Sequence, residues 1–436
     1  MYNRSIMAKD NKNKAWIIDV NMGYGHQRTA FPLKDLSANS IINANSYEGI
    51  PEKDKLIWES SRSFYEFISN TKRVPLIGNF IFSIFDKFQK ILLYYPKRDL
   101  SRSNFGLKKT FSLIKSGWGE NLINTLKGNP LPIVSTFFIP AFMAEHFNYP
   151  NSIYCVICDA DIARTWVPVD PLKSDIKYFA PCHWVVDRLK LYGVKKEDVF
   201  LTGYPLPKEN VGSDGEIARK DLAYRLLNLD PKKQYSKMYY PVIEDYVGKL
   251  PGRPNHPLTI MFSIGGAGAQ KEIAIKIADG LRTKIKRGKV KLIISAGTKE
   301  NVRDYVVENL KEKGFGKDID KNIEIIFGKN IKDYFTKFNK KLRKTDILWT
   351  KPSELSFYSG LGIPVIIAPT IGSQENFNKK WLLSRGSGFL QDDLRYVDQW
   401  LFDLLDNGML AEAAMQGFVE IDRMGTYNIE KIIFSQ

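Results

Sequence analysis

A histidine stands directly after a short glycine turn near the start of the chain, and a second glycine turn lies far downstream. The first turn is Gly23-Tyr24-Gly25, with His26 after it, and the second is Gly265-Gly266-Ala267-Gly268. Each turn follows an apolar run, a pattern that predicts a strand, a tight turn and the start of a helix. Because N–H groups at a helix start attract anions, each turn is a candidate anion site. Alternatively, the second turn could be a tight βα turn that binds no ligand, and His26 could be a buried structural histidine.

The elements that position these turns alternate between strand and helix. The first half predicts strands over 15–20, 131–137, 153–158 and 198–202, with a mostly helical stretch over 39–130. The second half predicts helices between strands over 258–264, 290–295, 322–327, 346–349 and 364–368. Strands separated by helices form parallel sheets. We therefore predict an α/β protein with two Rossmann-like domains facing a cleft.

The domain boundary is predicted at the proline- and glycine-rich stretch 203–207. The first domain covers 1–207 and the second covers 208–436. Residues 208–257 form a linker with one helix, and the last helices have room to pack back on the first domain.

The chain is strongly basic, with a formal net charge of +16 over 436 residues. This charge favours an anionic partner, such as a phosphorylated substrate or a membrane surface. Nucleic acid is not expected as a partner, because no recognition motif appears. Residues 1–14 lack the apolar core of a secretory signal, and no run of roughly 18 apolar residues occurs. With three cysteines, these features predict a cytoplasmic protein.

Cys155 and Cys158 have a spacing typical of metal ligands, and Cys182 with His183 could add two more. However, 153–158 is predicted as a buried strand, and side chains three residues apart on a strand point to opposite faces. Buried free cysteine is common core material, so no metal site is expected.

Apolar residues recur at helical spacing over 80–95, among them Phe85 and Phe88. Lys97 and Arg98 follow this stretch. An apolar helix face beside cations fits an anionic membrane surface, and packing on its own domain is the alternative.

Four motifs, in this order, resemble the GT-B-fold glycosyltransferases related to monogalactosyldiacylglycerol synthases and to the glycosyltransferase of peptidoglycan lipid II synthesis. The motifs are residues 23–30, 158–167 with 192–205, 265–269, and 350–378. Together they frame nearly the whole chain, and their order and spacing are more specific than any one motif.

The resemblance implies that the first domain binds an acceptor, often a membrane lipid, and that the second binds a nucleotide sugar as co-substrate, without a cofactor. Direct displacement requires a base for the acceptor hydroxyl and a group that stabilises the diphosphate leaving group. His26 is the first candidate base, and Asp159 or Asp161 is its rival. Arg164 is expected on the acceptor side, unless it pairs with Asp161.

The resemblance also implies a set of donor- and phosphate-binding residues. Carboxylate and amide groups among them could form paired hydrogen bonds with ribose and sugar hydroxyls. The set is Gly23, Gly25, Gly265, Gly266, Gly268, Lys351, Ser353, Glu354, Gln374, Glu375 and Asn378.

Three positions depart from the family's pattern. Tyr24 stands where a third glycine is usual, and Ala163 stands where a histidine is frequent. Phe357 stands where the family has a glutamate for the ribose. Glu354, one helical turn or about 5.4 Å earlier, is a possible substitute.

The sequence thus predicts a glycosyltransferase that moves a sugar, from a UDP-linked donor, to a lipid or lipid-linked acceptor. It would be cytoplasmic and peripheral at the inner membrane face, with an anionic membrane surface as partner. A nucleotide-sugar 2-epimerase is the alternative enzyme. A catalytically inactive lipid- or nucleotide-binding protein, consistent with Phe357, is the alternative of a different class.

Overall fold

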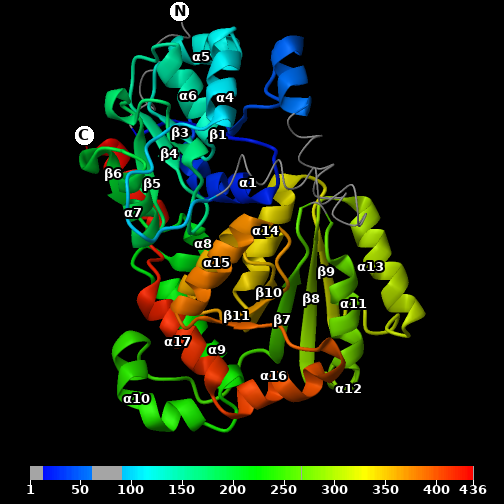
Figure 1. Cartoon of the computed structure of the whole chain (residues 1–436). Helices are drawn as coiled ribbons and strands as arrows, with labels where there is room; N and C mark the ends of the chain where they lie inside the picture. The colour runs from blue at the N-terminus through cyan, green and yellow to red at the C-terminus, as the bar shows by residue number, and fades with distance from the viewer. Residues whose placement is uncertain (1–12, 61–90, 267, 436) are drawn as a thin grey trace, which may run out of the picture. The chain divides into compact units, whose positions relative to one another are not determined.

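The computed structural model describes residues 13–60, 91–266 and 268–435 (Figure 1). The chain forms two compact units. The first comprises residues 1–205, 371–374 and 425–436, and the second comprises 206–370 and 375–424. Each unit is built around a parallel sheet of six strands. The predicted fold class, α/β with two Rossmann-like domains, is confirmed in these two sheets.

The sheet of the first unit has the strand order β2-β1-β3-β4-β5-β6. Strands such as β4 are apolar and buried along their whole length, as expected for parallel strands covered by helices. The elements are β1 (Trp16–Asp19), α1 (Tyr24–Ala30), η1 (Phe31–Leu36), β2 (Ile42–Asn43), α4 (Phe105–Lys115), α5 (Glu120–Lys127), β3 (Ile133–Ser135), α6 (Phe138–His146), β4 (Ile153–Val156), η2 (Arg164–Trp166), η3 (Pro171–Lys173), β5 (Lys177–Ala180), α7 (His183–Leu191), η4 (Lys196–Asp198) and β6 (Val199–Leu201).

The helix α18 (Gly425–Phe434) also belongs to the first unit. Its Ile429 and Ile433 join the buried core formed by strand residues such as Ile17 and Val134. Gly425 begins the helix where a Cβ would lie 2.2 Å from a backbone oxygen of the same unit, so no side chain fits there. The end of the chain therefore completes the core of its first sheet.

The sheet of the second unit has the strand order β12-β11-β10-β7-β8-β9. Figure 1 shows helices on both sides of it. The elements are α8 (Lys208–Val211), α9 (Glu216–Leu229), α10 (Gln234–Tyr246), β7 (Leu258–Ser263), α11 (Lys271–Gly280), α12 (Arg282–Lys286), β8 (Val290–Gly297), α13 (Glu300–Glu312), β9 (Ile323–Phe327), α14 (Ile331–Leu342), β10 (Ile347–Thr350), η5 (Glu354–Leu361), β11 (Val365–Ile367), α15 (Ser373–Ser384), β12 (Gly388–Leu390), η6 (Leu394–Tyr396), α16 (Val397–Asp406) and α17 (Met409–Glu420).

Several predicted elements differ from the structure. The helix predicted over 24–38 changes at Phe31 into the 3-10 helix η1, and the one over 353–361 is the 3-10 helix η5. Within the stretch predicted as mostly helical, residues 91–104 have no regular structure. The membrane helix predicted over 80–95 lies outside the described residues except for 91–95, which are not helical.

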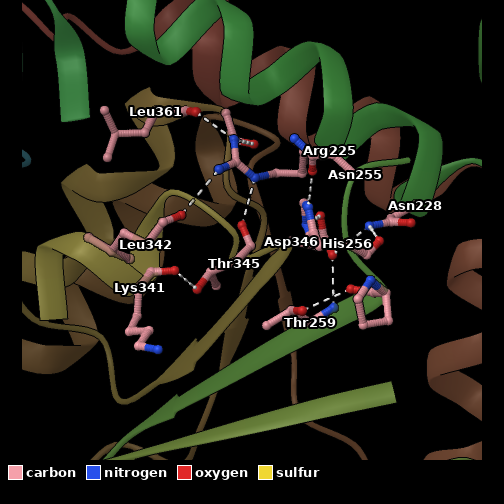
Figure 2. A network of polar contacts seen from close by, with 12 residues as sticks. Arg225, Asn228, Asn255, His256, Thr259, Lys341, Leu342, Thr345, Asp346 and Leu361 are labelled. Carbon is pink, nitrogen blue, oxygen red and sulfur yellow. Dashed lines mark hydrogen bonds and ion pairs between the residues drawn. The ribbon is translucent and has the colours of Figure 1, made fainter. Parts of the chain in front are cut away.

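A buried arginine fixes the amino ends of the central strands in the second unit (Figure 2). Arg225 of α9 donates to the carbonyl oxygens of Thr345 at 2.7 Å, Leu361 at 2.9 Å and Gly362 at 3.1 Å. Thr345 precedes β10 and Gly362 precedes β11. One guanidinium therefore satisfies carbonyl groups from two loops that would otherwise be buried without partners.

A carboxylate beside this arginine holds the start of β7. Asp346 is buried and accepts hydrogen bonds from the N–H of Thr259 at 2.8 Å and the side-chain amide of Asn228 at 3.0 Å. His256 Nε2 lies 3.1 Å from the second oxygen of this carboxylate. Burial raises the pKa of Asp346, and the contact with His256 opposes that shift. These contacts fix the amino ends of the strands relative to one another. They therefore also fix the positions of the carboxyl ends of the same strands.

Among the residues that the structure describes, no helix is both long and apolar enough to cross a lipid bilayer.

We predict that Arg225→Ala lowers the free energy of unfolding by at least about 3 kcal/mol, because it leaves several buried carbonyl oxygens without donors. Urea denaturation followed by tryptophan fluorescence measures the loss. Lys220→Ala, at an exposed position of the same helix, is the matched control and should change stability by no more than about 0.5 kcal/mol. Equal midpoints for the two variants would contradict the role given to Arg225.

Candidate functional site

The sheet of the first unit reverses its strand order between β1 and β3. From β1 the chain adds β2 on one side, and β3 to β6 follow on the other side. In open α/β sheets, ligands bind beyond the carboxyl ends of the strands at such a reversal. The turn that leads to His26 follows β1, and Thr136 follows β3, so both residues lie at this point.

His26 is held by a backbone carbonyl group at the reversal. Its Nδ1 lies 2.8 Å from the carbonyl oxygen of Thr136, and the hydroxyl of Thr136 donates back to the carbonyl oxygen of His26 at 3.0 Å. A carbonyl oxygen only accepts, so this contact requires the hydrogen on Nδ1. The lone pair of the neutral ring is then on Nε2, which is the arrangement that a general base needs.

The surroundings of His26 bring the second predicted motif close to the first. The Cys158 sulfur lies 3.5 Å from His26 Nδ1, and the same sulfur lies 3.8 Å from a carboxylate oxygen of Asp159. The rings of Phe137 and Trp166 lie 4.7 Å and 6.0 Å from the imidazole. Two of the candidate bases, His26 and Asp159, therefore both lie next to Cys158, and aromatic rings pack beside His26.

Asp161 lies in a different setting. Both of its oxygens accept from the guanidinium of Arg188, at 2.8 Å and 2.7 Å, and one also accepts from the indole N–H of Trp184 at 2.8 Å. The side chains of the ion pair are 1% and 0% exposed. Abstracting a proton would break a buried, bidentate ion pair, so these contacts indicate a structural role for Asp161.

Arg164 is also occupied within the first unit. Its guanidinium donates to the carbonyl oxygens of Ser101 at 2.8 Å, Val167 at 2.5 Å and Pro168 at 2.9 Å. The suggestion that Arg164 pairs with Asp161 is wrong, because Asp161 pairs with Arg188. The side chain of Arg164 is buried and ties loop 163–169 to residue 101, so these contacts indicate a structural role.

A buried acid that the sequence analysis did not single out ends strand β1. Asp19 is 6% exposed and accepts a hydrogen bond from the Asn43 side chain at 2.7 Å. Burial raises its pKa to about 6, and the bond from Asn43 opposes this shift. A carboxyl residue inside the apolar run 15–20 was the signal that could have identified it.

The sheet of the second unit reverses its strand order between β7 and β10. The glycine turn 265–268 follows β7, and Lys351 directly follows β10. Gly268 has φ +75°, in the left-handed region that favours glycine, and its N–H donates to the Gly265 oxygen at 2.7 Å. A Cβ on Gly265 would lie 3.1 Å from the Lys351 side chain. The turn and the lysine are thus packed against each other at the reversal.

Lys351 forms an ion pair at the start of α15. Its Nζ lies 2.6 Å from the Glu375 carboxylate. Gln374 precedes this glutamate, and the buried Asn378 follows it on the same helix. Gln270, which sequence reasoning missed, donates to the Pro369 oxygen at 2.7 Å and ties the glycine turn to the loop after β11. A cation and a carboxylate at one sheet edge could bind a phosphate and a hydroxyl.

The remaining predicted donor residues lie at η5. The Ser353 side chain caps this helix by accepting the Leu355 N–H, and Glu354 is buried in its first turn. Phe357 is fully buried, with its ring 4.7 Å from that of Trp381. The position where the family has its ribose glutamate is therefore part of the core in this chain.

Of the predicted membrane residues, Phe85 and Phe88 lie outside the described residues. Lys97 lies 5.5 Å from the ring of Tyr94, and Arg98 donates to the Pro96 oxygen at 2.9 Å. Close to them in the sequence, three large apolar side chains are strongly exposed. They are Leu93 at 73%, Tyr95 at 65% and Phe105 at 71%.

Comparisons with known proteins give one family model and a set of solved structures. Residues 252–428 match the model described as "Domain of unknown function (DUF6938)". No curated protein matches the chain. Structural matches include UDP-GlcNAc 2-epimerase from Neisseria meningitidis bound to UDP-GlcNAc, with 14% identity and a TM-score of 0.45 over 82% of this chain and 87% of that one.

Two glycosyltransferase matches accompany the epimerase. MurG of Acinetobacter baumannii has 13% identity and a TM-score of 0.43, over 85% of this chain and 96% of that one. A glycosyltransferase from Rickettsia africae has 13% identity and a TM-score of 0.38, over 97% and 100%. Proteins of both enzyme classes considered in the sequence analysis are thus among the solved structures that this chain resembles.

We predict that Asp19→Asn stabilises the protein above pH 6 and has little effect below pH 4. The folded-state pKa of Asp19 is raised, so the wild-type protein loses stability as the pH rises through about 6. A shift of this size corresponds to up to about 3 kcal/mol at pH 8. Thermal unfolding of both proteins from pH 4 to 8 measures the difference. A gain from Asp19→Asn that does not change with pH would contradict the buried, raised-pKa carboxyl group.

Proposed function

We propose that this protein is a glycosyltransferase that moves a sugar from a UDP-linked donor to a lipid or lipid-linked acceptor at a membrane surface. The first unit would bind the acceptor, and the second would bind the donor. The observation that carries the proposal is that each sheet has candidate groups of the required chemistry at its own strand reversal. His26 is the group in the first unit, and Lys351 with Glu375 is the pair in the second.

The acceptor step rests on the tautomer of His26. With Nδ1 donating to the Thr136 oxygen, Nε2 takes the proton from the acceptor hydroxyl as its oxygen attacks the anomeric carbon. Thr136 then holds the ring in place and stabilises the imidazolium that forms. Asp159 is the rival base, and its carboxylate lies 3.8 Å from the Cys158 sulfur, which also contacts His26.

The donor step rests on the cation at the second reversal. As the new bond forms, the bond between the anomeric carbon and the diphosphate oxygen breaks, and the leaving diphosphate gains negative charge. Lys351 would stabilise this charge together with the N–H groups of the glycine turn. Glu375 would accept hydrogen bonds from ribose or sugar hydroxyls, a task that the buried Phe357 cannot perform.

The membrane part of the proposal is supported by charge and by exposed apolar side chains. The chain has a net charge of +16, and Leu93, Tyr95 and Phe105 are exposed near Lys97 and Arg98. Apolar side chains beside cations are the composition of a surface that contacts anionic lipid. Such contact would present a lipid acceptor to the first unit.

The proposal is tested by incubating the full chain with a panel of labelled UDP-sugars and vesicles that contain diacylglycerol or a polyprenyl phosphate acceptor. Label in the lipid phase supports the transferase. Conversion of the free UDP-sugar into its 2-epimer would instead identify the alternative enzyme. Nucleotide binding without either product would favour an inactive binding protein.

We predict that Lys351→Met and Glu375→Ala each remove the thermal stabilisation by UDP. A ligand at 100 times its dissociation constant stabilises a protein by about 2.7 kcal/mol, which a thermal-shift assay resolves. Lys340→Met, at an exposed position on α14, removes the same charge elsewhere in the second unit and should keep the full shift. Unchanged nucleotide affinity in both site variants would remove this site from the proposal.

We predict that His26→Ala lowers the transfer rate by about 10²–10⁴-fold, the usual contribution of a general base, while UDP binding stays the same. Single-turnover transfer under saturating donor measures the rate, and His146→Ala in the same unit is the control. If Asp159 is the base, Asp159→Asn carries this rate loss and His26→Ala weakens acceptor binding instead. Full turnover of both variants would assign the proton to another group.

A further inference from the structure

The helix α10 exposes five large apolar side chains in the second unit. Their exposed fractions are 71% for Met238, 43% for Tyr239, 39% for Tyr240, 39% for Val242 and 46% for Tyr246. Scattered exposed apolar residues are normal on a protein surface, but five within nine consecutive residues form a patch. We call this set of five side chains the α10 patch.

The helix that carries the patch is firmly anchored. The carboxylate of Asp230 accepts from the N–H groups of Gln234 at 2.7 Å and Ser236 at 2.7 Å, which caps the first turn. Tyr235 and Ile243 are buried and anchor the helix, and the ring of Tyr235 packs against that of Tyr239 at 4.9 Å. Figure 1 shows α10 next to α17 and away from the sheet of its unit. The side chains of the patch are therefore exposed even though the helix that carries them is packed against its unit.

The backbone of α10 presents the patch on two segments. Tyr239 has non-helical angles, with φ −116° and ψ 25°, and Pro241 follows it inside the helix. A proline at this position kinks a helix, because it lacks the N–H and its ring crowds the preceding turn. Beyond the kink, Val242 and Tyr246 are four residues apart and so lie on one face.

Cations surround the patch. Residues 231–253 contain five lysine or arginine side chains and two acidic ones. Lys233, Lys237 and Lys249 are exposed, and no ion pair in the described part of the chain involves them. The α10 patch contains tyrosines and has lysines close to it in the sequence. This composition is complementary to a lipid bilayer, in which acyl chains lie below a layer of phosphates. The lysines can reach the phosphates, while tyrosine places an apolar ring at the boundary and a hydroxyl in the water.

We propose that the α10 patch is a second membrane contact of this protein, which docks on bilayers of anionic phospholipid. Met238, Tyr239 and Tyr246 would enter the boundary between headgroups and acyl chains, and Lys233, Lys237 and Lys249 would bind lipid phosphates. This surface belongs to the second unit and differs from the one around Lys97 and Arg98 in the first. It does not depend on transferase activity, so the two proposals can fail separately.

The experiment measures sedimentation of the full-length protein with vesicles of phosphatidylcholine alone or with 30% phosphatidylglycerol, at low and high salt. The patch variant is Met238→Ser with Tyr239→Ser and Tyr246→Ser, and the charge variant is Lys233→Ala with Lys237→Ala and Lys249→Ala. The matched control removes three exposed lysines at the far side of the same unit, Lys311→Ala, Lys317→Ala and Lys321→Ala. Urea unfolding and far-UV circular dichroism verify that each variant is folded.

We expect salt-sensitive binding of the wild-type protein to anionic vesicles, because surface cations attract anionic lipid. The patch variant and the charge variant should each lower the partition coefficient by about tenfold or more, while the control changes it by less than about threefold. The midpoint of urea unfolding should be close to the wild-type value in all of them, since every substituted side chain is exposed.

Three results would overturn the proposal. Wild-type affinity in both α10 variants, with loss only in Lys97→Ala with Arg98→Ala, would assign membrane contact to the first unit alone. Equal binding to neutral and anionic vesicles would contradict the role of the lysines. A wild-type dimer that becomes monomeric in the patch variant, with unchanged vesicle binding, would show that a second copy of the chain covers the patch.

Discussion

The reversal of strand order in each parallel sheet is the constraint on which the rest of this structure depends. Between β1 and β3 and between β7 and β10, the connections run to opposite sides, so the loops beyond these strands are directed apart. Both glycine turns, His26 and Lys351 lie in those loops. In each unit separately, the reversal places these loops beyond the strand ends, where ligands bind in open α/β sheets.

In the second unit, a network of buried polar contacts lies at the edge opposite the reversal. In the second unit, Arg225 and Asp346 bind the backbone at the amino ends of β7, β10 and β11 (Figure 2). In the first unit, the buried pair of Asp161 with Arg188 joins the loop after β4 to α7, on the carboxyl side of the sheet. Buried charges of this kind are costly unless every partner is present. They therefore favour one arrangement of the loops in each unit.

The departures from the family pattern acquire a physical meaning in the structure. Phe357 belongs to the core against Trp381, so on the proposed function the hydrogen bonds to a ribose would come from Glu375 or Glu354. Lys351 brings a cation to the end of β10, in contact with the glycine turn and paired with Glu375. On the proposed function, the ion pair of Lys351 with Glu375 would have to open when the donor binds. Contacts with the diphosphate would then contribute more to donor affinity than contacts with the ribose.

Much of the secondary structure could be predicted from the sequence, because it depends on short-range patterns. The strand expected over 258–264 is β7 (Leu258–Ser263), and the helix expected over 300–313 is α13 (Glu300–Glu312). The helix α10 was missed, because Pro241 and its exposed apolar side chains interrupt the pattern of a half-buried helix. His26, Lys351 and Glu375 were predicted as site residues from motif order and stay predictions, whereas Asp19 was not singled out because it lies in an apolar run.

What only the tertiary structure decided is which distant side chains meet. Asp161 finds Arg188 rather than its neighbour Arg164, Nδ1 of His26 meets the carbonyl oxygen of Thr136, and Ile433 completes a core begun by Ile17. The sequence by itself determined the alternation of strand and helix, the glycine turns and the basic charge, because each of these is a local or additive property of the chain. Contacts between distant residues depend on strand order, and strand order results from packing the whole of each unit.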